Sequence, residues 1–233
     1  MKIGVINFSG NTGKSTLATH LLKPRIEGAS SFAIESLNSG ADRQAILYRG
    51  TQYDALQEEV LLSESAVVDI GSSNVDDFLR LMAKSQGSHE DFDYFVIPTM
   101  KEIKKQVDSV ATMKSLRALG VETERIRIVF NAVEPADLDV LDEVFPHVFE
   151  ASENRHCVFN YPCAVYQNEV FERLKSDGRT VSEVVADTTD YRAILRKTTD
   201  RAEREGLVDR IVTQRLARSA HENLNAVFAA LFT

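Results

Sequence analysis

The chain has 233 residues, of which 43% are hydrophobic and 27% are charged. This length suits one sizeable α/β core and is short for two domains, so we expect a single domain over residues 1–233. The net charge of −8 argues against a protein that coats nucleic acid over its whole surface. No apolar run is long enough to cross a membrane, and the N-terminus has no signal-peptide pattern, so we expect a cytoplasmic protein.

Short apolar, β-branched segments alternate with helical patterns along the chain. The expected strands are residues 2–7, 31–34, 66–70, 94–97 and 126–130. The expected helices are residues 14–23, 52–62, 75–84, 103–119, 138–144 and 168–176, with Gly120 as a stop and Ser182 with its neighbours as the cap of a further short helix. The alternation predicts an α/β fold, a doubly wound and mostly parallel sheet with helices on both faces. Its ligand site is expected at the carboxyl ends of the strands.

A phosphate-binding loop is indicated directly behind the first strand, in the run Asn7-Phe8-Ser9-Gly10-Asn11-Thr12-Gly13-Lys14-Ser15-Thr16. Gly10 and Gly13 allow the backbone to approach a phosphate oxygen closely. Lys14 can reach the outer phosphates, and the Ser15 hydroxyl can ligate Mg²⁺. The following helix would point its positive dipole end at the same place, so a nucleotide phosphate chain is the expected occupant.

The loop departs from the usual Gly-x-x-x-x-Gly-Lys-Ser/Thr pattern, because Phe8 stands five positions before Gly13. A chance match on a surface helix is the alternative, which the preceding strand and the helical spacing of the following leucines disfavour. Ser9 to Thr16 resembles the deviant loop of ParA/MinD-type ATPases, Lys-Gly-Gly-x-Gly-Lys-Thr/Ser-Thr. Ser9 stands at the first lysine of that pattern and Asn11 at its second glycine.

Two acidic residues follow expected strands. Asp69 ends the run Ala66-Val67-Val68 and resembles the strand-ending Asp that holds the Mg²⁺ water shell in these ATPases; the alternative is a helix cap. Glu35 stands where ParA-like proteins have Asp-x-Asp, here reduced to one acid in Glu35-Ser36-Leu37. Its carboxylate could orient the attacking water, or it could be a solvated loop charge.

Asn131 ends the strand Val129-Phe130 and resembles the family's adenine-binding Asn. Its amide can donate and accept hydrogen bonds together, as the edge of adenine requires. The alternative is an ordinary turn residue. No Asn/Thr-Lys-x-Asp run follows, which disfavours guanine.

The resemblance extends through Phe95-Val96-Ile97-Pro98-Thr99 and Gly178-Arg179-Thr180-Val181. More narrowly, the opening 15 residues, residues 68–75 and residues 87–93 look like the StbB proteins of plasmid stability operons. The resemblance implies ATP and Mg²⁺ as cofactors and weak or partner-stimulated ATP hydrolysis that controls dimerisation or partner binding. It assigns nucleotide binding to Gly10, Asn11, Thr12, Gly13, Lys14, Ser15, Thr16 and Asn131, the metal to Ser15 and Asp69, and catalysis to Lys14, Glu35 and Asp69.

The same resemblance implies work in plasmid partition, stability or conjugation. The implied partners are an adenine nucleotide, a second copy of the chain in a nucleotide-dependent dimer, and a small DNA-binding protein of the same operon, with plasmid DNA reached indirectly. In the ParA/MinD family the first loop lysine crosses into the partner's site. Because Ser9 replaces it here, nucleotide binding without significant hydrolysis is an alternative function.

The C-terminal region, residues 190–231, predicts two helices broken near Glu205-Gly206, the second with an apolar stripe that packs on the sheet or on a partner subunit. Residues 190–218 hold eight basic and five acidic side chains, against 19 basic and 30 acidic elsewhere. Direct DNA binding through segment 192–218 is therefore an alternative function, although the interspersed acids favour a salt-bridged helix face.

The sequence also allows two alternatives that fewer residues support, a zinc site and a kinase function. Cys157 and Cys163 match neither a paired metal motif nor a disulfide framework, so we expect reduced structural thiols, with zinc held together with His147 and His156 as the alternative. A small-molecule kinase that shares the phosphate loop is disfavoured because the sequence shows no Arg-rich lid, although Arg43 and Arg49 could contact phosphate.

Overall fold

The computed structural model describes residues 1–35, 45–49, 52–160 and 163–233. Seven strands form one sheet in the order β3-β2-β4-β1-β5-β6-β7, and every described pair is parallel. The strands are β1 Lys2–Val5, β2 Ser30–Ile34, β3 Ile46–Tyr48, β4 Ala66–Ile70, β5 Tyr94–Thr99, β6 Ile126–Val133 and β7 Ala164–Tyr166. This confirms the predicted fold class. The short outer strands β3 and β7 were not predicted.

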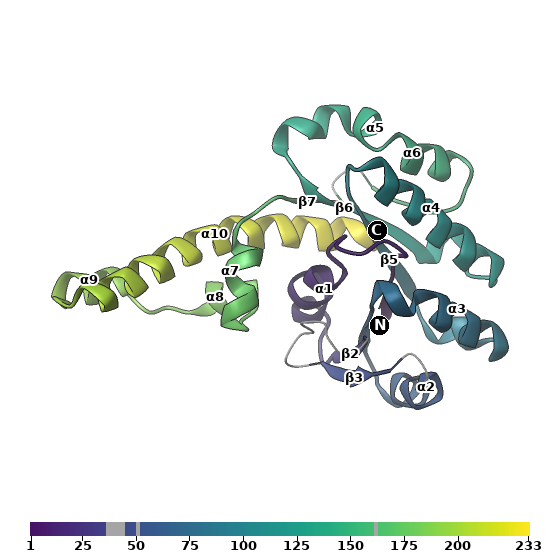
Figure 1. The fold of residues 1–233 in the computed structure, drawn as a ribbon, viewed down its shortest axis with the longest axis horizontal. Helices are drawn as coiled ribbons and strands as arrows, with labels where there is room; N and C mark the ends of the chain where they lie inside the picture. The colour runs from purple at the N-terminus through teal and green to yellow at the C-terminus, as the bar shows by residue number, and fades with distance from the viewer. Residues whose placement is uncertain (36–44, 50–51, 161–162) are drawn as a thin grey trace.

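Helices cover both faces of the sheet (Figure 1). One face is covered by α2 Tyr53–Leu62, α3 Val75–Lys84, α4 Ile103–Ala118, α5 Leu141–Val144 and α6 Pro146–Glu153. The other is covered by α1 Lys14–Thr16, the π-helical η1 Leu17–Leu22, α7 Val170–Asp177, α8 Val181–Ala186 and the last part of α10 Arg201–Leu231. Short 3₁₀ turns lie at η2 Lys23–Arg25, η3 Ser72–Asn74, η4 Ser88–Asp91, η5 Thr123–Arg125 and η6 Pro135–Val140.

Two apolar layers hold the sheet between these helices. Side chains alternate along each strand, so Phe95 and Ile97 of β5 pack in the first layer while Val96 between them packs in the second. All three are fully buried. Burial of both faces explains why the inner strands are almost continuously apolar.

The expected helices at residues 52–62, 75–84 and 103–119 agree with α2, α3 and α4 to within a residue. The expected helix at 138–144 begins instead as a 3₁₀ turn at Pro135 and becomes α-helical at Leu141. The short helix predicted near Ser182 is α8, and its cap lies two residues before Ser182. Thr180 caps α8, because its side chain accepts the Glu183 N–H while the Glu183 carboxylate accepts the Thr180 N–H.

The predicted helix break near Glu205-Gly206 was wrong. α9 Tyr191–Lys197 ends before the break at residues 198–200, and α10 then runs through Gly206 without interruption. Asp200 caps its start by accepting the Glu203 N–H. A single glycine weakens a helix by only about 1 kcal/mol, which the rest of a 31-residue helix outweighs.

α9 and the first half of α10 extend away from the sheet as an arm (Figure 1). We use "the arm" for residues 191–212. Arg204 joins its two helices by donating to the carbonyls of Leu195 and Thr198 at 3.0 and 2.8 Å. The Arg210 guanidinium lies over the Tyr191 ring, 5.5 Å from its centroid. Among the described residues, none of the helices combines the length and apolar character needed to cross a bilayer.

Candidate functional site

The loop between β1 and α1 has a backbone that depends on two left-handed residues. Asn11 has φ 53° and Gly13 has φ 92°. Asn is among the few residues that tolerate this region, whereas a Cβ on Gly13 would lie 2.1 Å from Asn131 Nδ2. Glycine is therefore required at position 13 both by its φ angle and by the side chain that packs against it.

Asn7 anchors the start of the loop. Its side chain is fully buried; Nδ2 donates to the Pro98 carbonyl and to Ser109 Oγ, each at 2.8 Å, while Oδ1 accepts the Ser9 N–H at 2.7 Å. The loop is thereby tied to the end of β5 and to α4. Asn7 was not among the predicted site residues, although a polar residue directly after a buried strand was a usable signal.

Lys14 points back into the loop. Its ammonium group donates to the carbonyls of Asn7 and Ser9 at 3.2 and 2.8 Å, and the residue is only 7% exposed. Burial lowers the pKa of Lys14 to about 8, and the nearby carboxylates of Asp69 and Glu35 act against this shift. A buried ammonium group near two acids, at the start of a helix, is suited to an anionic ligand.

Asp69 and Glu35 lie at the same edge of the sheet. Val5 pairs with Asp69, so β1 and β4 end side by side. The Ile34 carbonyl accepts the Gly71 N–H at 2.9 Å, which draws the end of β2 to the same place. A Cβ on Gly71 would lie 2.8 Å from that carbonyl and 3.7 Å from Glu35 Cγ. The loop after β4 therefore packs closely on Glu35.

The predicted metal ligands have suitable chemistry. Mg²⁺ prefers hard oxygen ligands and keeps several of its waters, and Asp69 supplies a carboxylate that is 7% exposed. Ser15 follows Lys14 in the first turn of α1. The loop that leads to α1 starts at the end of β1, where Val5 pairs with Asp69. The loop after β4 also reaches the phosphate loop, because a Cβ on Gly10 would lie 3.4 Å from Ser72 Oγ.

Asn131 lies against the loop from β6. Its Nδ2 donates to the Thr12 carbonyl at 2.8 Å, across 119 residues of sequence, and Thr12 is fully buried. The contact fixes the loop at the point where Gly13 turns. The amide oxygen and the second amide hydrogen remain for the predicted contact with adenine, which stays a prediction.

The structure thus brings together Lys14, Asp69, Glu35 and Asn131, four residues spread over 118 positions of the chain. Of the two arginines considered as phosphate contacts in a kinase, Arg43 lies outside the described residues, and Arg49 is exposed after β3. Within the described ranges, no three His, Cys, Asp or Glu side chains are placed to hold a metal ion. Cys157 and Cys163 are free and buried, and burial raises the pKa of Cys157 to about 12.

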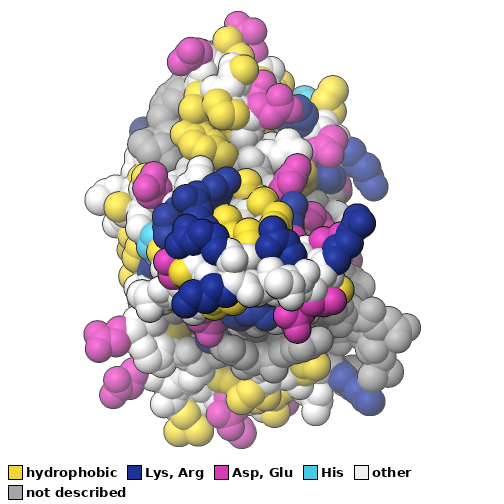
Figure 2. Space-filling view, turned by 90° about the vertical axis from the view of Figure 1, so that its left-hand side faces the viewer, with side chains coloured by type: hydrophobic (Ala, Val, Ile, Leu, Met, Phe, Trp, Pro, Cys, Tyr) yellow, Lys and Arg dark blue, Asp and Glu magenta, His cyan; other side chains and the backbone are white. Residues whose placement is uncertain are grey.

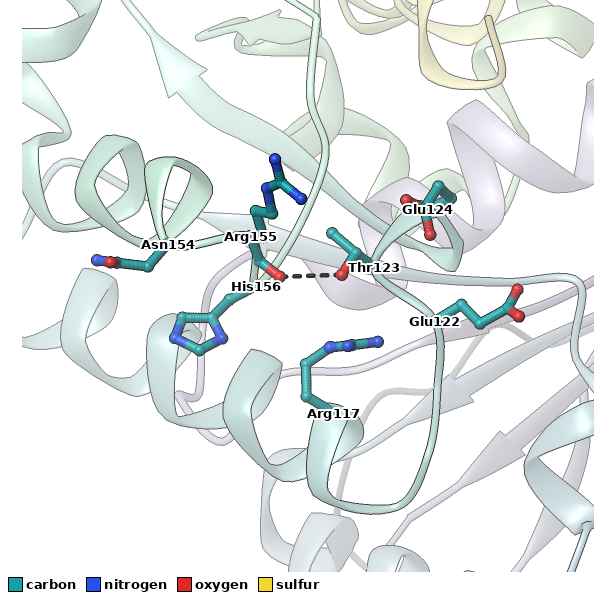
Figure 3. Close-up of a pocket in the computed structure, with 7 residues that line it drawn as sticks. All are labelled: Arg117, Glu122, Thr123, Glu124, Asn154, Arg155 and His156. Carbon is teal, nitrogen blue, oxygen red and sulfur yellow. Dashed lines mark hydrogen bonds between the residues drawn. The ribbon is translucent and has the colours of Figure 1, made fainter.

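A hollow of about 560 Å³ lies at the opposite edge of the sheet, where β6 begins (Figure 3). Figure 3 shows Arg117, Arg155 and His156 around it, together with Glu122 and Glu124. Thr123 donates to the Arg155 carbonyl at 2.9 Å across it. Its mixed charges favour neither an anion nor a cation, and strands of a parallel sheet place this end far from the phosphate loop, so we regard it as separate from the site.

No protein-family model matches the sequence, and no curated protein matches it significantly. Solved structures do match. A candidate plasmid partition protein from Borrelia burgdorferi, bound to AMPPNP, has a TM-score of 0.53 at 11% identity over 98% of both chains. An ATP complex of a McdA variant from Cyanothece has a TM-score of 0.48 at 14% identity over 96% of both chains. MinD from Aquifex aeolicus has a TM-score of 0.49 at 12% identity, over 94% of this chain and 97% of the MinD chain.

Identities this low show similarity of fold alone. The Borrelia structure, the one of these three whose TM-score exceeds 0.5, covers nearly the whole of both chains. It confirms the predicted fold, a parallel sheet with helices on both faces.

Proposed function

We propose that the chain is a Mg²⁺–ATP-dependent switch of a plasmid stability, partition or conjugation system. ATP binds the loop from Gly10 to Thr16, Ser15 and Asp69 hold the metal, and Glu35 orients the attacking water. Slow hydrolysis then controls dimerisation or binding of a small DNA-binding partner. The adenine ring contacts Asn131.

The observation that carries this proposal is the position of Lys14. Its ammonium group is buried inside a loop that turns through the left-handed residues Asn11 and Gly13, at the edge of the sheet where Asp69 and Glu35 also lie. Backbone amides, a helix N-terminus, one cation and oxygen ligands for a metal are the parts that phosphoryl transfer uses. When bound, Mg²⁺ would neutralise charge on the outer phosphates. The fold supports the proposal, because a protein of this fold was solved with AMPPNP.

Phosphate release and nucleotide affinity, measured together, test the proposal. The unmodified chain should release phosphate from Mg²⁺–ATP above background, and Lys14→Ala should lose both binding and release. Asp69→Asn should keep nucleotide binding in the absence of metal but lose release. If the unmodified chain bound ATP and released no phosphate, even with its partner present, the switch would have to work without hydrolysis.

Binding without hydrolysis is the second candidate function, favoured by Ser9. The Ser9 side chain is neutral, so this position supplies no cation of its own. Ser9 is 8% exposed, and its carbonyl accepts a hydrogen bond from the Lys14 ammonium group. Substituting Ser9→Lys separates the two functions. A large gain of phosphate release in this variant, from an unmodified chain that releases none, would identify a binding module.

The basic side chains of the arm favour direct DNA binding as a third candidate. Figure 2 views the molecule from the end of the arm, where Lys and Arg side chains gather. Within the part of the chain that the structure describes, Arg192, Arg196 and Lys197 have no ion-pair partner, whereas Arg201 pairs with Glu205 at 3.0 Å. Replacing the three unpaired residues by Gln should abolish DNA binding and its steep salt dependence, if the intact chain shows any.

A further inference from the structure

A second lysine lies beside the phosphate loop. Lys105, in the first turn of α4, places its ammonium nitrogen 3.5 Å from the Asn11 carbonyl, 2.9 Å from Glu102 Oε1 and 3.3 Å from the sulfur of Met100. Its side chain is 21% exposed. Lys101 and Lys104, on either side of it in sequence, are exposed to solvent. The fold therefore holds Lys105, and not its neighbours, against the loop.

The charges around the loop leave a role for such a group. Lys14 is the only cationic residue from Asn7 to Thr16, and it already lies near the carboxylates of Asp69 and Glu35. The outer phosphates of a nucleotide would bring several more negative charges into this partly buried region. Unbalanced charge is costly where water is excluded, so a further cation at the loop would strengthen binding.

Lys105 can be moved to a new partner at small free-energy cost. Its ion-pair partner Glu102 is 53% exposed, and exposed ion pairs contribute about 0–1 kcal/mol. The contact with the Asn11 carbonyl is long, at 3.5 Å, and is also weak. A phosphate oxygen, which carries a full charge and forms shorter hydrogen bonds, would compete well for the ammonium group.

We propose that Lys105 is the second cation of the nucleotide site and contacts the terminal phosphate from the outer side of the loop. This inference rests on the proposed function, since it assigns a residue to the same nucleotide. It gives position 105 the charge that Ser9 does not supply. It also predicts selectivity for the triphosphate over the diphosphate, because only the triphosphate carries the terminal phosphate that Lys105 contacts, whereas the loop amides bind the phosphates that both nucleotides share.

Calorimetric titrations with ATP, ADP and AMP test the assignment on the full chain. Lys105→Gln should weaken ATP binding about tenfold or more and ADP binding clearly less. Lys105→Arg should recover most of the affinity, because it restores the charge. Lys104→Gln is the matched control on the next residue of the same helix and should change neither affinity. Thermal unfolding without nucleotide should be the same for all four proteins.

Two results would overturn the role of Lys105. Affinity of Lys105→Gln for ATP within twofold of the unmodified chain would show that the ammonium group does not meet the phosphates. Equal weakening of ATP binding and ADP binding would show that Lys105 only fixes the Asn11 peptide. Failure of the unmodified chain to bind any nucleotide would instead remove the proposed function itself, so the two failures are distinguishable.

Discussion

The phosphate loop and the arm place their polar side chains in opposite surroundings. In the loop, Asn7 and Thr12 are fully buried and have hydrogen-bond partners from distant parts of the chain. Lys14 is 7% exposed and donates to carbonyls of the loop itself. In the arm, Arg192 and Arg196 are exposed to solvent. Fixed, buried groups suit chemistry that needs defined geometry. Solvated groups on an extended helix suit contact with a partner, and changing them should leave the fold intact.

The comparison predicts the largest effect for Asn7→Ala. The change leaves the Pro98 carbonyl and the Ser9 N–H without their buried partner, so the free energy of unfolding should fall by about 3 kcal/mol. Urea denaturation measures this loss. Asn154→Ala is the matched control, since Asn154 is exposed and should change stability by less than about 0.5 kcal/mol. Equal losses in both variants would contradict the anchoring role of Asn7.

Gly13→Ala should act mainly on nucleotide binding. A side chain at φ 92° costs about 1–3 kcal/mol, and its Cβ would also collide with Asn131. ATP affinity should therefore fall about ten- to a hundredfold. The double variant Gly13→Ala with Asn131→Ala should recover only part of the loss, because the φ strain remains. Full recovery would show that the collision alone matters, and no loss at all would place the nucleotide elsewhere.

The pH dependence of ATP affinity should report on Lys14. With its pKa lowered to about 8 in the free protein, Lys14 loses its proton as pH rises through that value. The bound phosphates favour the charged form, so affinity should fall roughly eightfold from pH 7.5 to pH 9. Without nucleotide the sign is opposite: the unfolded chain holds the proton to higher pH, so stability should rise between about pH 8 and 10.5. A flat affinity profile over this range would rule out a titrating Lys14.

The smallest effect is expected in the arm, from Gly206→Ala. Gly206 lies inside α10, and nothing lies within 4 Å of a Cβ placed there. Alanine should therefore stabilise the protein by about 0.5–1 kcal/mol through helix propensity alone. Chemical denaturation checks the sign. A loss of stability would indicate a break at Gly206 and would contradict the continuous helix.

Local patterns in the sequence predicted the parts of the fold that local physics determines. The spacing of Val75, Phe78, Leu79 and Met82 marks one buried face, and α3 has the expected bounds. The predicted helix break at Gly206 was wrong, because a glycine lowers helix propensity without ending a long, capped helix. The three-residue strands β3 and β7 are too short to show a period of two.

The site could be predicted only where one segment carries its own signal. The loop from Gly10 to Thr16 was recognisable from its glycines and Lys14, and its backbone in the structure is left-handed at Asn11 and Gly13. Lys105 was not recognisable as a site residue, because it is 94 residues from Asn11 in sequence and belongs to no motif. Its proximity to the loop depends on how α4 packs after β5, which no local pattern reveals.

Isothermal titration of the folded chain with Mg²⁺–ATP at pH 7.5 tests the central claim most directly. We predict saturable binding of one adenine nucleotide per chain, lost in Lys14→Ala and retained in the exposed control Lys104→Gln. The contradicting result would come from protein that still shows a cooperative unfolding transition. If that protein gave no heat of ATP binding and no competition by ADP, this loop would not bind a nucleotide.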